Sequence, residues 1–429
     1  MQEALLQYIW KNSLFEDREY VADTGEKIRI LDAGMQNTDG GPDFFHAKIR
    51  IDETLWAGNV EIHTKTSEWG RHRHNTDAAY NNVILHASLE NDTPCYSEGG
   101  RRIPCIEISF NPKIEEHYHK LVEVDHMIPC HKSLPELNVS LISFWLSALA
   151  IERLSDKTAY IQQLLQHTRN NWEETFHIIM ARNFGLKINA VPFELLAKST
   201  PLKIIRKHTH NRFELEALLF GQAGFLQKPL VDEYQESLYQ EYTYLKKKYR
   251  LKGIEPHLWK YLRLRPSNFP AVRISQLCSL LHQSKRLFSV TMECSTVDEL
   301  LETYSCSVSE YWKYHYKFGK EGQSGKKSLG LRTKMSLIIN TIVPFMFIYG
   351  KHKNRGQLQE KAIQLLESIP PEKNRITQIW SGFQIHCRHA ADSQALLQLT
   401  QAYCHPKQCL NCQIGYLVIN NSRNETRKS

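Results

Sequence analysis

The stretch that most restricts how this chain can fold is residues 41–65, GPDFFHAKIRIDETLWAGNVEIHTK. Apolar and polar residues alternate over residues 44–51 and again over residues 55–64, and the polar residues 52–54 stand between the two runs. Alternation over runs of this length is typical of β-strands that have one buried face. The stretch therefore predicts two strands joined by a tight turn.

Polar side chains are expected on one face of this strand pair. Because successive strand residues point to opposite faces, Glu61, His63 and Lys65 fall on the same face of the second strand. Asp43 stands where the first strand begins. Carboxylates from neighbouring strands suit hard cations, so Asp43 and Glu61 are candidate ligands of Mg2+ (or Mn2+). A solvated sheet face with ordinary polar residues is the alternative interpretation.

The predicted order of helix, strand, strand with an aspartate and strand with a glutamate resembles the core of the PD-(D/E)XK nucleases. Pro42-Asp43 matches the first motif of that superfamily, and Glu61-Ile62-His63 matches the second, except that His63 stands where a lysine is usual. A lysine follows two residues later, at Lys65. The resemblance implies metal-dependent cleavage, with Asp43 and Glu61 holding the metal and Lys65 or His63 orienting or deprotonating the attacking water.

A second resemblance covers essentially the whole chain. The segments that carry it are GPDFFHAKI, GNVEIH, RPSNFPAVRISQL, INTIVPF and YCHPKQCLNCQIG. They are similar to a bacterial protein family whose function is unassigned. This resemblance is the more specific of the two, and it brings no activity with it.

Strand patterns and helical patterns occupy different parts of the sequence. Residues 2–15 predict an amphipathic helix, in which Glu3 is a supporting metal ligand by the nuclease resemblance, or simply a charge that suits the helix dipole. Further strands are predicted up to residue 110, and long helical patterns follow from residue 140. We expect an α+β fold: a nuclease-like α/β domain over residues 1–130, with a mixed sheet and flanking helices, and a large all-α domain over residues 131–429.

The net charge of +8 is spread unevenly along the 429 residues. Residues 1–130 contain 13 lysines and arginines against 22 aspartates and glutamates, and the rest of the chain contains 41 against 24. A basic surface attracts polyanions, because the phosphates that it neutralises release counterions. The helical part is therefore a candidate nucleic-acid surface, and a mildly basic soluble surface is the alternative.

Nothing in the sequence predicts a membrane protein. The first residues lack the basic flank and apolar core of a signal peptide. The most apolar run, residues 338–349, is shorter than the roughly 20 residues that a bilayer requires. We expect a cytoplasmic protein.

Histidines near the strand pair offer a different metal site, formed by His63, His72, His74 and His86. Imidazole suits Zn2+, so a zinc-dependent hydrolase is a further interpretation. No two of these histidines have the i, i+4 spacing of helical zinc motifs. His86, which stands among apolar residues of a predicted strand, fits a buried core residue better than a ligand.

Four of the ten cysteines, Cys387, Cys404, Cys409 and Cys412, fall in the last tenth of the chain. The last three have the spacing Cys-x4-Cys-x2-Cys. Thiolates this close in sequence can chelate one metal centre, and Zn2+ or an iron–sulfur cluster fits the ligand type. The other six cysteines, and by the alternative interpretation these four as well, are reduced and buried thiols.

These features favour a metal-dependent nuclease, or a nuclease-derived nucleic-acid-binding protein, whose basic helical part holds the phosphate backbone. The alternative is a non-catalytic binding or scaffold protein, in which the face of Glu61 and His63 is structural and the cysteines form a zinc staple. Nucleic-acid affinity that survives chelation of metals, without turnover, distinguishes the second function from the first.

Overall fold

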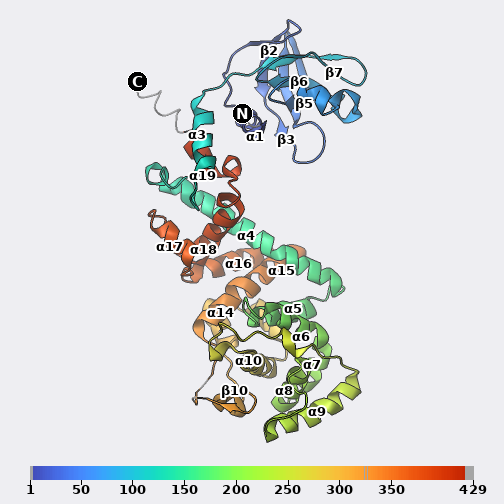
Figure 1. Cartoon of the computed structure of the whole chain (residues 1–429), viewed down its shortest axis with the longest axis vertical. Coiled ribbons are helices and arrows are strands. Elements are labelled where there is room, and N and C mark those ends of the chain that lie inside the picture. The colour runs from blue at the N-terminus through green and yellow to red at the C-terminus, as the bar shows by residue number, and fades with distance from the viewer. Residues whose placement is uncertain (1–2, 323, 326, 421–429) are drawn as a thin grey trace. The chain divides into compact units, whose positions relative to one another are not determined.

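The computed structural model describes residues 3–322, 324–325 and 327–420, which form two compact units (Figure 1). Unit 1 comprises Met1–Trp145 together with Leu399–Ser429, and unit 2 comprises Leu146–Gln398. The boundary expected near residue 130 therefore lies at residue 145, and the end of the chain belongs to the first unit. The predicted α+β class is confirmed, with a mixed sheet in unit 1 and helices throughout unit 2.

Unit 1 is built on a seven-stranded mixed sheet with the strand order β1-β2-β4-β5-β6-β9, in which β3 also pairs with β4. Neighbouring strands from β1 to β5 are antiparallel, whereas β5 and β6, and β6 and β9, are parallel. The strands are β1 (Tyr20–Val21), β2 (Lys27–Asp32), β3 (Met35–Gln36), β4 (Phe44–Ile51), β5 (Thr54–Ile62), β6 (Val83–Ser88) and β9 (Cys105–Glu107).

The predicted strand pair of residues 41–65 is formed by β4 and β5. Its turn consists of Asp52 and Glu53, since the residues on either side of them pair directly. Asp52 adopts a positive φ of 50°, which aspartate tolerates better than most residues in a tight turn. Strand β5 ends at Ile62, two residues earlier than the alternation indicated.

Helix α1 (Glu3–Lys11) packs against the sheet, and it is shorter than the predicted helix over residues 2–15. Leu6 and Trp10 of this helix are fully buried in the same apolar cluster as Phe44 of β4. The indole N–H of Trp10 also donates to the carbonyl of Ala33 at 3.0 Å, so the ring buries no unsatisfied polar group. This packing fixes the position of the polar residues at the start of α1.

The connection between β5 and β6 is short and irregular. It contains α2 (Glu68–Arg71) and the 3-10 turns η1 (His74–Thr76) and η2 (Ala78–Tyr80). Arg73 adopts the left-handed φ of 63°, which reverses the chain between α2 and η1. Because parallel strands need a crossover connection, this segment must return across the sheet, and it carries two histidines with it. The hairpin of β7 (Cys95–Tyr96) and β8 (Arg102–Ile103) follows β6.

The end of the chain completes unit 1. It contains the π-helical η7 (Leu399–Cys404), the 3-10 turn η8 (Cys409–Asn411) and α19 (Gln413–Ile419). Helix α19 lies beside α3 (Lys113–Glu123), as Figure 1 shows, and the His117 Nδ1 atom is 3.1 Å from the carbonyl of Ile419. The Asn420 side chain donates to the Tyr8 hydroxyl of α1 at 2.9 Å, which joins residues 412 positions apart. Between α3 and the segments of unit 2 lies the 3-10 turn η3 (Leu134–Glu136).

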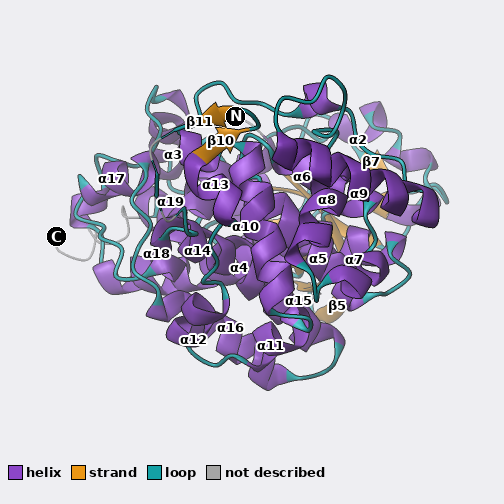
Figure 2. Cartoon of the chain, turned by 90° about the horizontal axis from the view of Figure 1, so that it is seen from below, coloured by secondary structure: helices purple, strands orange, loops and turns teal. Residues whose placement is uncertain are grey.

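Unit 2 is helical except for a short hairpin of β10 (His315–Lys317) and β11 (Lys320–Glu321) (Figure 2). The helical character predicted from residue 140 onward is confirmed. The helices and helical turns are α4 (Val139–His167), which begins in unit 1, α5 (Trp172–Phe184), α6 (Ala190–Ser199), α7 (Leu202–His208), α8 (Arg212–Gln222), α9 (Glu233–Tyr249), η4 (Pro256–Leu258), η5 (Pro266–Asn268), α10 (Pro270–Gln283), α11 (Leu287–Glu293), α12 (Val297–Thr303), α13 (Glu310–Tyr314), α14 (Leu331–Leu337), η6 (Ile338–Ile342), α15 (Val343–His352), α16 (Gly356–Ser368), α17 (Arg375–Ser381) and α18 (Ala390–Gln398).

The most apolar run of the sequence lies in a continuous helical stretch, Leu331–His352, formed by α14, η6 and α15. By length and composition alone, this is the one helical stretch among the described residues that is long and apolar enough to cross a membrane. Within unit 2, 56% of its most apolar window is buried. Ile338, Val343 and Phe345 have no exposed surface, so packing inside the unit accounts for these apolar side chains.

Candidate metal centre

Glu61 and His63 stand at the carboxyl end of β5 and are almost fully buried, with 4% and 1% of their surface exposed. The backbone N–H of His63 donates to the carbonyl of Ala87 at 3.2 Å, which extends the pairing of β5 with β6 by one residue. Val60 and Ile62, which alternate with them, belong to the apolar core of the sheet. The predicted alternation therefore places Glu61 and His63 together, on a face separate from that core.

Asp43 is joined by two hydrogen bonds to the end of β5, which carries Glu61, its partner in the predicted pair of metal ligands. The backbone N–H of Asp43 donates to Glu61 Oε2, and the backbone N–H of Ile62 donates to Asp43 Oδ2, both at 3.0 Å. Gln7 of α1 donates to Asp43 Oδ1 at 2.8 Å and to Glu3 Oε1 at 3.3 Å. Glu3, the residue expected to support the site, is thus linked through Gln7 to the cluster formed by Asp43 and Glu61.

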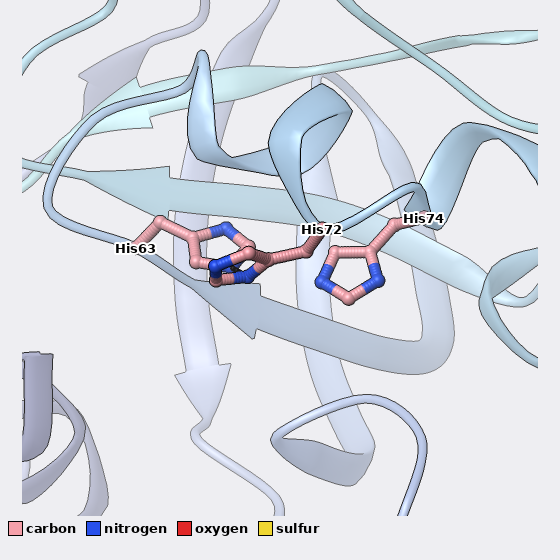
Figure 3. Close-up of side chains that lie close together, drawn as sticks. All are labelled: His63, His72 and His74. Atoms are coloured by element: carbon pink, nitrogen blue, oxygen red, sulfur yellow. Dashed lines mark hydrogen bonds between the residues drawn. The ribbon is translucent and has the colours of Figure 1, made fainter.

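Three histidines complete the group (Figure 3). His63 comes from the end of β5, His72 from the end of α2 and His74 from the start of η1. His63 Nε2 lies 3.2 Å from His72 Nδ1, and one ring nitrogen from each of the three histidines lies within 4.8 Å of the others. His63 and His74 are buried, whereas His72 is exposed. The three rings can therefore share one ion that is reached from the side of His72.

Glu61 links the histidines to Asp43. Its Oε1 atom lies 3.2 Å from His74 Nε2 and 3.6 Å from His63 Nε2, while its Oε2 atom faces Asp43. His74 Nε2 is buried and makes no hydrogen bond among the described residues. A buried nitrogen without a hydrogen bond is costly, and coordination of a cation would use its lone pair.

Burial dominates the electrostatics of the group. Burial, and next the charge of Glu61, raise the pKa of Asp43 to about 7. Burial, together with His74 and His72, lowers the pKa of His63 to about 3. Burial also raises the pKa of Glu3. His63 is consequently a neutral imidazole at physiological pH, which is the form that binds metal ions, and a cation beside Asp43 would favour its ionised form.

A second group of possible ligands lies behind His63. His63 Nδ1 is 2.9 Å from His86 Nε2, and His86 Nδ1 is 3.1 Å from the sulfur of Cys95 and 3.9 Å from that of Cys105. These ligand atoms of His86, Cys95 and Cys105 also lie within 4.8 Å of one another, and the three residues have at most 1% of their surface exposed. The interpretation of His86 as a buried core residue is confirmed, and its core contacts are polar.

Lys65 does not join this group, which corrects the expectation that it shares a face with Glu61 and His63. Beyond Ile62 the chain still pairs with residues 87–90, and in this pairing Lys65 lies opposite Glu90. Lys65 is exposed, and its Nζ atom lies 2.7 Å from Glu90 Oε2. The hydrogen bond from Lys65 to Glu90 raises the pKa of the lysine.

The C-terminal cysteines are divided between the units. Cys404, Cys409 and Cys412 belong to unit 1 and are buried, whereas Cys387 belongs to unit 2, where its charged neighbour is Asp392. Cys130, which also belongs to unit 1, is buried, as expected of a core thiol.

The two loop histidines were only weak candidates from the sequence. They fall in an aperiodic stretch, and nothing in their spacing indicates that α2 and η1 turn His72 and His74 toward β5. The one available signal was the alternation Arg71-His72-Arg73-His74 close behind a strand that carries a buried carboxylate.

Comparison with known proteins identifies one relationship. No curated protein and no solved structure matches this chain. A family model described as "Protein of unknown function (DUF2851)" matches residues 3–375, which include the whole carboxylate and histidine group and exclude Cys404, Cys409 and Cys412. The match spans most of the 429 residues, and the chain therefore belongs to the DUF2851 family of proteins of unknown function.

Proposed function

We propose that this protein is a divalent-metal-dependent hydrolase that cleaves phosphodiester bonds in nucleic acid. The observation that carries the proposal is the position of Glu61. One of its carboxylate oxygens accepts the backbone N–H of Asp43 at 3.0 Å, and the other lies 3.2 Å from His74 Nε2. Glu61 thus stands between a second carboxylate and a set of three imidazoles, and all of these groups are metal ligands.

A bound cation explains why so many ionisable groups are buried in one place. Glu61, His63 and His74 are buried, and polar or charged groups that are removed from water destabilise a fold unless something compensates them. The hydrogen bonds to Asp43 and Glu61 compensate part of this cost, but His74 Nε2 has no hydrogen bond among the residues described. A divalent ion would supply the missing partner and favour the ionised form of both carboxylates.

The ligand types favour Mn2+ or Zn2+. The sequence predicted Mg2+ (or Mn2+) at Asp43 and Glu61, and Mg2+ prefers oxygen ligands throughout. Three histidines beside Glu61 suit an ion that also accepts nitrogen ligands. We assign Glu61, His63, His72 and His74 as the residues that hold the ion. This set combines Glu61, from the predicted carboxylate pair, with three histidines of the alternative zinc site.

When bound, such an ion lowers the pKa of a coordinated water, which becomes a nucleophile near neutral pH. The Asp43 carboxylate, which lies beside Glu61, would accept a proton from that water. Gln7 holds the other oxygen of this carboxylate at 2.8 Å and keeps it oriented. His72 is the exposed histidine of the three, so a substrate would approach the ion from its side.

Nucleic acid is the proposed substrate for two reasons. The order of α1 with Glu3, β4 preceded by Asp43 and β5 with Glu61 agrees with the order of the PD-(D/E)XK motifs that the sequence resembles. The chain after residue 130 also carries 41 basic against 24 acidic residues, a composition that suits a polyanion.

The test is cleavage of labelled single-stranded DNA, double-stranded DNA and RNA by metal-stripped protein after addition of Mn2+, Zn2+ or Mg2+. We expect turnover with Mn2+ or Zn2+, and a loss of about 100-fold or more in Asp43→Asn and in Glu61→Gln. Glu53→Gln, which alters an exposed carboxylate in the turn between β4 and β5, is the matched control and should cleave at the wild-type rate.

Two results would contradict the proposal. Cleavage that is equal in wild type, Asp43→Asn and Glu61→Gln would exclude these carboxylates from the reaction. Nucleic-acid binding that survives EDTA, without turnover under any metal, would favour the non-catalytic binding protein, for which the replacement of the usual lysine by His63 is the supporting observation.

A further inference from the structure

An imidazole and two thiols meet next to His63, where β6, β9 and the hairpin of β7 and β8 come together. His86 lies on β6, and Cys105 at the start of β9 is its direct partner in the parallel pairing of these strands. Cys95 at the start of β7 pairs with Ile103 of β8, two residues before Cys105. The registers of both pairings therefore bring the three side chains together.

One nitrogen of His86 faces both sulfurs. Its Nδ1 atom lies 3.1 Å from the Cys95 sulfur and 3.9 Å from the Cys105 sulfur, and the three ligand atoms all lie within 4.8 Å of one another. In a tetrahedral Zn2+ site, a nitrogen and a sulfur ligand are separated by about 3.6 Å, because they lie about 2.1 Å and about 2.3 Å from the ion. The two observed separations lie on either side of this value, so an ion requires shifts of only about 0.5 Å.

The three side chains are shielded from water. His86, Cys95 and Cys105 each have at most 1% of their surface exposed. The two cysteines belong to a small apolar cluster whose other members are Trp69, Tyr80, Val83 and Ile103. An ion buried here must have its charge balanced locally, and two thiolates balance one divalent cation.

The second nitrogen of His86 is held by a hydrogen bond. Its Nε2 atom lies 2.9 Å from the Nδ1 atom of His63. A histidine ligand of a metal ion usually donates its other N–H to a neighbouring acceptor, which fixes the orientation of the ring. His63 occupies the position of that acceptor, and the Nδ1 atom of His86 is thereby directed at the two sulfurs.

We propose that His86, Cys95 and Cys105 bind one Zn2+ ion in the interior of unit 1. Binding replaces the protons of the two thiols by metal–sulfur bonds and releases these protons, without a change in the oxidation state of the cysteines. Thiolate and imidazole ligands favour Zn2+ over Mn2+ and Mg2+, which suit carboxylates. The carbonyl oxygen of Thr66 lies 3.5 Å from the Cys95 sulfur and can supply the fourth ligand.

The hydrogen bond between the two histidines makes this ion oppose the ion of the hydrolytic centre. With Nδ1 bound to Zn2+, His86 carries its proton on Nε2 and donates it to His63 Nδ1. His63 then keeps its own proton on Nε2, and only Glu61, His72 and His74 remain to hold the other ion. This opposition rests on the function proposed above, whereas the zinc site itself does not.

The first test is titration of the metal-free, reduced full chain with Co2+, which replaces Zn2+ in protein sites. Thiolate ligands give bound Co2+ an intense near-ultraviolet charge-transfer absorption that carboxylate and imidazole ligands do not give. Cys105→Ser should lose roughly one equivalent of thiolate-bound Co2+ relative to wild type. Cys130→Ser, which changes another buried cysteine of unit 1, is the matched control and should lose none.

Circular dichroism shows whether each variant is folded, and a further variant separates loss of a ligand from loss of structure. Cys105→His should still bind zinc, because imidazole replaces thiolate in zinc sites. Equal charge-transfer absorption in Cys105→Ser and wild type would overturn the proposal.

The second test needs no mutation. X-ray absorption at the zinc edge, on wild-type protein loaded with one equivalent of zinc, should show two sulfur neighbours at about 2.3 Å together with lighter atoms at about 2.0–2.2 Å. A shell of four sulfurs would assign the ion to other cysteines, and a shell without sulfur would assign it to the hydrolytic centre. Either result would overturn the proposal.

A third measurement tests the opposition between the two ions. One equivalent of zinc should weaken Mn2+ binding by about 10-fold or more in wild type, because His63 is lost as a ligand, and should have no effect in Cys105→Ser. If the sulfur shell is present but Mn2+ binding is unchanged, the zinc site stands and the role of His63 in the hydrolytic centre is wrong.

Discussion

The Nδ1 atom of His63 lies 2.9 Å from the Nε2 atom of His86 in the interior of unit 1. His86 in turn places its Nδ1 atom 3.1 Å from the Cys95 sulfur. If the proton between the two rings resides on His63 Nδ1, the Nε2 atom of His63 carries a lone pair and faces His72 and Glu61. In that arrangement His86 would hold His63 in the tautomer that can bind a metal ion, without being a ligand of that ion itself.

His86→Gln should weaken metal binding while leaving the ligands in place. Groups that orient a histidine ligand typically contribute 10-fold to 100-fold to metal affinity, so we expect a loss in that range with an unchanged stoichiometry. Calorimetric titration of metal-stripped protein with Mn2+ measures both quantities. His117→Gln, which changes a histidine elsewhere in unit 1, is the control; equal affinities for all three proteins would show that His86 has no orienting role.

Asp43→Asn should alter how stability depends on pH. The pKa of Asp43 in the folded protein is about 7, above the usual 3.8. Ionisation of this carboxyl therefore destabilises the metal-free wild type as the pH rises from about 4 through 7, and the asparagine variant escapes this loss. Between pH 5 and pH 8 the variant should gain about 2 kcal/mol relative to wild type. Urea denaturation of both metal-free proteins at the two pH values measures the difference.

The variant Asp92→Asn provides a control of opposite sign. Hydrogen bonds from Ser67 lower the pKa of Asp92, so its carboxylate stabilises the folded protein above the usual pKa and this stabilisation is lost as the pH falls. Asp92→Asn should therefore be less stable than wild type at neutral pH and approach it in acid. A difference between Asp43→Asn and wild type that stays constant with pH would contradict the assigned shift.

Lys65→Ala should leave cleavage and metal content at wild-type levels. Its ammonium group is exposed and paired with Glu90 at 2.7 Å, outside the group of buried ligands. A lysine that acted in proton transfer would instead cost about 10²-fold to 10⁴-fold in rate when removed. Cleavage rates are measured for Lys65→Ala and Glu90→Ala. A loss of rate in the lysine variant alone would show that Lys65 takes part in the reaction.

Gly58→Ala should destabilise the pairing of β5 with β6, which holds Glu61 in place. A Cβ atom at Gly58 of β5 would lie 2.4 Å from the Ile84 Cγ2 atom and 3.0 Å from the Asn82 carbonyl oxygen, so β6 must shift. Overpacking of this kind costs about 1–3 kcal/mol. Gly99→Ala, where a Cβ atom meets nothing within 4 Å, should unfold at nearly the wild-type urea concentration. Identical unfolding of the two variants would show that β5 and β6 adapt freely.

The parts of the site that the sequence predicted are those governed by local periodicity. Alternation over residues 44–62 was sufficient to place Asp43 and Glu61 together. It predicted that the two strands pair, and pairing brings the start of β4 beside the end of β5. The same rule failed at Lys65, because this lysine pairs with Glu90, a contact that the alternation did not indicate. The fold class was predictable for the same reason, as strand and helix periods occupy separate parts of the chain.

The remaining ligands depend on contacts that no local pattern encodes. His72 reaches His63, and His74 reaches Glu61, only because the left-handed Arg73 reverses an aperiodic loop. Cys404, Cys409 and Cys412 belong to unit 1 only because the end of the chain folds back onto α1 and α3. Both are consequences of tertiary packing, and a single sequence gives no measure of which distant residues will pack together.

The return of the C-terminal segment to α1 and α3 also sets an order of events during synthesis. Residues 399–420 leave the ribosome after all of unit 2, yet Asn420 donates to Tyr8 and α19 lies beside α3. Unit 2 is contiguous in sequence and can fold while the chain is still growing. Unit 1 cannot complete its fold, and part of its surface stays exposed, until residues 399–420 have been synthesised. The unit that is translated first is thus the one that is completed last.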